Sequence, residues 1–158
     1  MSLSRGARVR GILLGLALAV GLLAVTAATT LPGVVENTLN QIEYSAYEEP
    51  SDEAVELHAK LTVVDMHSDT LLWDRDLNEW GSRGHVDVPR LQEGNVAIQV
   101  FSSVSKTPKK QNYDSNPDNT DNIRLLTIVQ AQPIRTWNSE LERSLYHAQK
   151  LRDAADAS

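Results

Sequence analysis

The sequence of 158 residues contains no cysteine. This absence excludes disulfides, thiolate metal sites, a cysteine nucleophile and an acylated lipoprotein cysteine, so any bound metal must use histidine and carboxylate ligands. Basic residues are also few, with 15 Lys and Arg against 21 Asp and Glu and a net charge of -6. Because phosphate binding needs clustered Lys and Arg, this acidic balance argues against a nucleic acid as partner.

The first part of the chain lacks charge of either sign. Residues 11–35 contain no charged side chain, and Leu, Ala, Val and Gly dominate them up to Ala28. As a helix, the stretch from Gly11 to Ala28 would be about 27 Å long, close to the thickness of the hydrocarbon core of a bilayer. Three arginines precede it: Arg5, Arg8 and Arg10. We therefore expect residues 1–35 to be a single-pass membrane anchor with a cytoplasmic N-terminus and an exported remainder, in the periplasm or outside the cell.

Cleavage is the alternative for this segment. Val25, Thr26 and Ala27 are residues that a signal peptidase could accept, and cleavage there would give a secreted product. The apolar run is longer than the roughly 7 to 15 residues usual in a signal peptide. The length of the run therefore favours an anchor that is retained.

The residues that follow divide into a connector and a helix. Residues 36–50 are mainly polar and predict a juxtamembrane connector. Residues 51–61 predict a short helix, because Ser51 or Asp52 can cap its N-terminus and acidic residues fill its first turn. His58 lies off the apolar face of this helix, and we expect it to be solvated.

An apolar, β-branched run from Thr62 to Met66 predicts a strand that ends in His67 and Asp69. In an extended strand residues i and i+2 point to the same face, so the two side chains can share one metal ion. Imidazole nitrogen and carboxylate oxygen suit zinc. The alternative is that the two side chains only hydrogen-bond each other near a turn. Asp65 is expected either to support this strand end or to be a plain turn carboxylate.

The His-x-Asp pattern recurs at His85 and Asp87. Here the carboxylate precedes Pro89 and a closing Gly94, which together frame one or two helical turns. This context favours an N-cap role for Asp87 over a metal ligand. His85 remains a weak candidate for contact with a substrate.

Alternating apolar residues over 96–104 predict a second strand, and a short helix between two strands fits the opening of a β/α barrel. Residues 105–122 are almost wholly polar and predict a long loop. If the strands are parallel, this loop lies at the same edge of the sheet as His67, where loops often shape active sites. Asp121 is expected to cap a further helix that runs to Val129.

A capping box at Ser139 to Glu142 predicts the start of a last helix. Its apolar residues share one face, which is expected to pack against another part of the protein: Leu141, Leu145, Ala148 and Leu151. His147 lies on the flank of this face. We expect it to be a surface or rim residue and not a ligand.

Three blocks of the sequence resemble the membrane (renal-type) dipeptidases, peptidase family M19. They are VVDMHSDTLLWDR at residues 63–75, GHVDVPRLQEG at 84–94 and AIQVF at 97–101, in the order and spacing of the family. The likeness covers roughly residues 52–157. It implies that residues 51–158 are the N-terminal part of a longer catalytic domain with an α/β fold, a metal-dependent (β/α)8 TIM-barrel hydrolase.

By this resemblance, His67 and Asp69 bind one zinc ion of a binuclear pair, and the complete enzyme hydrolyses dipeptides. A bridging glutamate and two further histidines complete the family's site, and the sequence does not show them. Glu140 and Glu142 lack the family's surrounding residues, and His147 is not followed by a second histidine. The resemblance therefore predicts a zinc-dependent metallodipeptidase, of which the present chain is an incomplete part that is inactive alone. A homo-oligomer is compatible with it.

Two other interpretations remain open. The chain could be a membrane-anchored, exported protein that binds a partner without catalysis, or a degenerate fragment of an enzyme. It could also be a metal-dependent barrel hydrolase outside the peptidases, although those usually carry His-x-His on the first strand, where this chain has His-x-Asp at His67 and Asp69.

Overall fold

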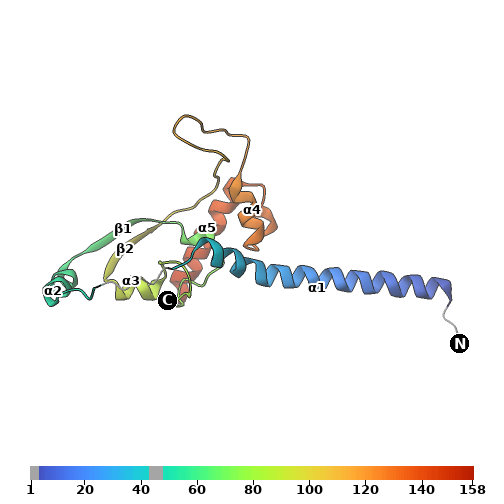
Figure 1. The fold of residues 1–158 in the computed structure, drawn as a ribbon, viewed down its shortest axis with the longest axis horizontal. Helices are drawn as coiled ribbons and strands as arrows, with labels where there is room; N and C mark the ends of the chain where they lie inside the picture. The colour runs from blue at the N-terminus through green and yellow to red at the C-terminus, as the bar shows by residue number, and fades with distance from the viewer. Residues whose placement is uncertain (1–3, 43–47) are drawn as a thin grey trace.

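The computed structural model describes residues 4–42 and 48–158 of the chain. It combines one long N-terminal helix with a larger part that contains shorter helices and two strands (Figure 1). The elements in chain order are α1 (Arg5–Leu39), α2 (Asp52–Lys60), β1 (Val63–Ser68), η1 (Thr70–Leu72), α3 (Val88–Glu93), β2 (Val96–Phe101), α4 (Asn122–Val129), η2 (Ile134–Thr136) and α5 (Glu140–Ala157). The fold class is thus mixed helix and strand.

Side-chain caps start the helices where the sequence predicts them. Ser51 accepts a hydrogen bond from the backbone of Ala54 at the start of α2, and Asp87 accepts one from Arg90 in α3. Asp121 caps α4, and Ser139 accepts from the Glu142 N–H at the start of α5. Each of these bonds satisfies a backbone N–H that has no partner within its helix. The predicted N-cap role of Asp87 is confirmed.

The two strands form a parallel sheet, as predicted. Asp65 pairs with Gln99 and Ser68 with Phe101, so the C-terminal ends of both strands meet at one edge. β1 extends past Met66 to Ser68, and β2 ends at Phe101, before the predicted residue 104. One face of this sheet carries apolar side chains that are exposed: Val64, Met66, Ile98 and Val100.

The long helix α1 contains 35 residues and has mean hydropathy 2.4 over its most apolar stretch, none of which is buried. By length and composition it could cross a membrane, and a signal sequence would meet the same test. α1 continues past residue 35 to Leu39, so the start of the predicted connector is helical. Within that connector, residues 43–47 lie outside the described part of the chain.

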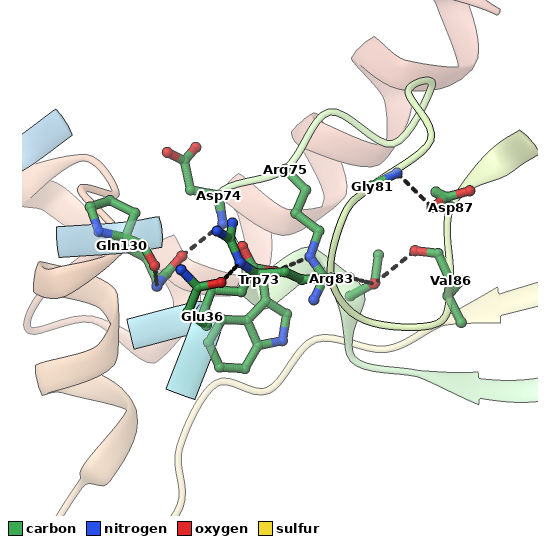
Figure 2. Close-up of polar contacts among 12 residues, drawn as sticks. Glu36, Trp73, Asp74, Arg75, Gly81, Arg83, Val86, Asp87 and Gln130 are labelled. Atoms are coloured by element: carbon green, nitrogen blue, oxygen red, sulfur yellow. Dashed lines mark hydrogen bonds and ion pairs between the residues drawn. The ribbon is translucent and has the colours of Figure 1, made fainter. Parts of the chain in front are cut away.

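The C-terminal end of α1 makes polar contacts with the loop between η1 and α3 and with Gln130, which follows α4 (Figure 2). Glu36 is buried and forms an ion pair with the Nε of Arg75. The Nε2 of Gln130 donates to the carbonyl of Pro32 over 3.4 Å, and the N–H of Gly84 donates to the carbonyl of Asn40 over 3.3 Å. α1 is therefore attached to the rest of the protein at Pro32 and beyond, where its apolar run has ended.

Gly84 sits directly against this ion pair, and its φ of 69° lies in the left-handed region. A Cβ added there would overlap the guanidinium of Arg75, which Glu36 holds in place. We expect Gly84→Ala to lower the free energy of unfolding by at least about 1–2 kcal/mol, the backbone cost alone. Urea titration of the detergent-solubilised chain measures this change in the free energy of unfolding. Gly33→Ala is the control, because Gly33 is helical and its nearest neighbour is 4.0 Å away, so an equal loss there would contradict the prediction.

The last helix does not pack as its sequence pattern predicts. Leu141 and Leu145 are exposed, whereas Arg143 and His147 are fully buried against the other elements. Arg143 explains the inversion, because its guanidinium donates to the backbone carbonyls of Thr136, Trp137 and Ser105 and to the carboxylate of Asp121. The prediction that His147 is a surface or rim residue is wrong.

Candidate functional site

His67 and Asp69 lie together at the C-terminal end of β1. The Nε2 of His67 is 3.1 Å from the Oδ1 of Asp69, and the two side chains are 71% and 47% exposed. Asp69 itself has left the strand and precedes η1, with φ of -92° and ψ of 17°. The side chains therefore meet, but through the turn at Asp69 and not on an extended strand as predicted. The contact also fits the alternative that the two side chains hydrogen-bond each other near a turn. Both side chains are partly open to solvent at the edge where the strands end.

Asp65 supports this strand end from within β1. Its Oδ1 accepts a hydrogen bond from the backbone N–H of His67 over 3.2 Å. A hydrogen bond from the Gln99 side chain, followed by that from His67, lowers the pKa of the Asp65 carboxyl below its usual 3.8. The ionised carboxylate thus orients the backbone at His67. Of the two roles predicted for Asp65, the structure favours support of the strand end.

Ser102 is a site residue that the sequence analysis missed. It follows β2 directly, and its hydroxyl donates to the Oδ1 of Asp69. The carbonyl of Ser68 lies 3.1 Å from the same hydroxyl but already accepts the Ser102 N–H over 2.9 Å. Since a carboxylate is the stronger acceptor, Asp69 is the better partner for this hydroxyl proton. The signal that could have identified Ser102 is its position at the end of the neighbouring parallel strand.

The donors at this edge fit a divalent metal ion only in part. An imidazole nitrogen and a carboxylate oxygen are suitable zinc ligands, and His67 and Asp69 are close enough to share one ion. Among residues 4–42 and 48–158, no group of three or more His, Asp or Glu side chains is placed to hold a metal. The described residues therefore offer two donor side chains here, fewer than a zinc site needs.

The second His-x-Asp pair does not form an equivalent site. Asp87 is buried, and its carboxylate accepts from the backbone N–H groups of Gly81 and Arg90 over 3.0 and 2.9 Å and pairs with the Arg90 guanidinium. Its oxygen atoms are occupied by these donors. His85 is exposed, as is His58 on α2, whose predicted solvated state is confirmed. His67 thus differs from both in having a carboxylate partner that still faces solvent.

Ser103 and His147 form a pair that resembles a nucleophile with its base. The Ser103 hydroxyl is 2.8 Å from the Nδ1 of His147, and the Nε2 of His147 is 3.5 Å from the side-chain nitrogen of Gln132. Gln132 donates to the carbonyl of Leu72 over 3.0 Å, which fixes its amide with the NH2 group toward His147. The tautomer that fits these contacts has its proton on Nδ1 and donates it to Ser103. In that tautomer the imidazole does not accept the serine proton, so we interpret the pair as a structural contact.

A polar pocket of about 300 Å3 lies elsewhere, beside the end of α1. Asp74, Asp76, Glu79 and Arg83 are among its lining residues, together with the Glu36–Arg75 pair. Neither His67 nor Asp69 lines it. The pocket therefore belongs to the attachment of α1 and is separate from the strand-end pair.

The candidate site thus consists of His67 and Asp69, with Asp65 and Ser102 positioning them. Comparison with known proteins identifies no relative, since no family model, no curated protein and no solved structure matches this chain. The interpretation of the site rests on the chemistry of its own residues and on the sequence blocks that surround them.

Proposed function

We propose that this chain is the N-terminal part of a zinc-dependent dipeptidase of peptidase family M19. The observation that carries the proposal is the convergence of His67 and Asp69 at the C-terminal end of a strand with a parallel neighbour. In β/α barrels this end of the strands is where functional residues gather. The three sequence blocks with the family's order surround this pair and its neighbouring strand.

The roles of the residues follow from their geometry. His67 would provide an imidazole nitrogen and Asp69 a carboxylate oxygen to one metal, and the hydrogen bond from Ser102 would fix the orientation of that carboxylate. In a binuclear centre of this type, zinc lowers the pKa of a bound water and polarises the scissile carbonyl of the dipeptide. The proposal requires a bridging glutamate and two histidines from later strands, because the described residues supply none of them at this edge.

The open sheet supports the barrel part of the proposal. β1 and β2 pair with each other, and the apolar face formed by Val64, Met66, Ile98 and Val100 is exposed. Further strands would pair with the free edges, and helices would cover this face, as in a closed (β/α)8 barrel. Free strand edges and an exposed apolar face are both expected of the first strands of such a barrel when the later strands and helices are absent.

We also propose that α1 is an uncleaved, single-pass anchor with a cytoplasmic N-terminus. Arg5, Arg8 and Arg10 flank its apolar run on one side only, which favours this orientation. The helix runs unbroken through Val25 to Ala27, the residues that a signal peptidase could accept.

The test is first to sequence the coding DNA beyond the Ser158 codon, and then to measure the zinc content of the protein that the complete gene produces. We expect that product to contain zinc and to hydrolyse dipeptides. His67→Ala and Asp69→Ala should each abolish hydrolysis and reduce bound zinc. Ser102→Ala should weaken zinc binding by about tenfold, the lower end of the effect of removing a hydrogen-bond partner of a ligand.

His85→Ala is the matched control, because His85 belongs to the other His-x-Asp pair and is exposed. It should leave zinc content and hydrolysis unchanged. If the product ends at Ser158 and binds no zinc, or if Asp69→Ala keeps full activity, the dipeptidase proposal is wrong. The first of these results would favour the alternative of a membrane-anchored, exported binding protein without catalysis.

A further inference from the structure

An apolar groove of about 460 Å3 lies between α1 and the segment that joins α4 to α5. Its lining residues include Ala27, Ala28 and Leu31 on the α1 side and Ile128, Ile134 and Trp137 on the other side. Ile134, in η2, is 76% exposed. The groove is therefore an apolar surface that the described protein leaves uncovered.

The position of the groove along α1 places it at a membrane surface. The uncharged part of α1 starts at Gly11, and a hydrocarbon core of about 30 Å is crossed by about 20 helical residues. The core would therefore end close to Thr30. Ala27, Ala28 and Leu31, which line the groove, lie at this level. Side chains that pack beside them lie at the same depth as the edge of the bilayer.

Trp137 and Arg135 beside the groove have polar partners within the protein, which leaves their apolar parts free to contact lipid. The indole N–H of Trp137 donates to the carbonyl of Gln132 over 2.9 Å, so its ring can contact lipid without an unsatisfied donor. Arg135 is next to Ile134, and its Nε forms an ion pair with Glu142 over 3.1 Å. Tryptophan is enriched at the interface between membrane and water.

We propose that η2, with Ile134 at its exposed tip and Ile128 and Trp137 beside it, contacts the same bilayer that α1 crosses. The occupant of the groove is lipid acyl chain, because the groove is continuous with the apolar surface of α1. This inference rests on the proposal that α1 is a retained membrane anchor. A second contact beside α1 would stop the body from rotating freely about the helix and would fix the direction in which the strand ends face.

Site-directed spin labelling tests this contact directly, because the chain has no cysteine of its own. The full chain carrying Ile134→Cys and a nitroxide label is reconstituted into phosphatidylcholine vesicles. The control is Leu57→Cys in α2, which is 61% exposed and lies at the opposite end of the molecule from the N-terminus of α1 (Figure 1). In vesicles we expect the label at 134 to collide less often with a water-soluble nickel chelate, and more often with oxygen, than the label at 57. The label at 57 should be readily accessible to the nickel chelate, because it lies in water.

Three results would contradict the proposed contact between η2 and the bilayer. If the chain floats with the vesicles but the label at 134 is as accessible to the nickel chelate as the label at 57, the groove faces water or awaits a protein partner. If labels at 134 broaden each other's spectra in vesicles at low protein density, a second copy of the chain covers the groove. If the unlabelled chain fails to float with vesicles, the anchor proposal fails and the contact fails with it.

Discussion

Replacement of Glu36 by alanine is expected to release the C-terminal end of α1 from the rest of the protein. Glu36 and Arg75 are 6% and 11% exposed in their side chains, so the change leaves a guanidinium buried without its counter-charge. Removal of one member of a buried ion pair typically costs about 3–5 kcal/mol. This free-energy cost applies only while α1 packs against the loop, because Arg75 is hydrated when α1 is released. The equilibrium constant for packing of α1 against the loop should therefore fall by more than a hundredfold.

Hydrogen–deuterium exchange of the detergent-solubilised full chain measures this release. Backbone amides in residues 73–87, the loop that receives α1, should exchange faster in Glu36→Ala than in the unchanged protein. The matched control is Glu56→Ala, which removes an exposed pair with Lys60 and should change exchange little, since such pairs contribute at most about 1 kcal/mol. Equal exchange of the loop in the two variants would show that the Glu36 pair does not hold the helix.

The sequence predicts the local elements of this fold because their signals are local. An N-cap residue and the helix it starts are adjacent in the chain, so Ser51, Asp87, Asp121 and Ser139 could be identified without any knowledge of packing. The meeting of His67 and Asp69 also depends on a spacing of two residues, although a turn at Asp69 replaces the predicted extended strand. In each case the partners are fixed by backbone geometry over a few residues.

The parts that the sequence did not predict depend on contacts between distant residues. Glu36 looks like the first residue of a polar connector, and only Arg75, which the loop after η1 brings to it, explains its burial. Ser102 reaches Asp69 because two strands pair in a particular register. The buried face of α5 follows the hydrogen bonds of Arg143 instead of the apolar residues Leu141 and Leu145.

The burial of His147 has a large consequence for the pH dependence of stability. It is fully buried in α5, and its pKa is lowered from 6.5 to about 4, first by burial and then by the positive charges of Lys150 and Arg143. In the unfolded chain it would take up a proton near pH 6.5, while the folded protein resists protonation until about pH 4. Protons are therefore bound preferentially by the unfolded state between these values.

We expect the free energy of unfolding to be constant with respect to His147 above pH 6.5 and to fall by about 3 kcal/mol as the pH drops to about 4. Urea titrations of the detergent-solubilised chain at several pH values in this window measure the fall. His147→Asn keeps a polar group near Ser103 but cannot titrate, so its curve should be flatter by that amount, whatever its stability at pH 7. His58→Ala removes an exposed histidine and should follow the unchanged protein. Parallel curves for His147→Asn and the unchanged protein would mean that His147 takes up its proton equally well in the folded and unfolded chain.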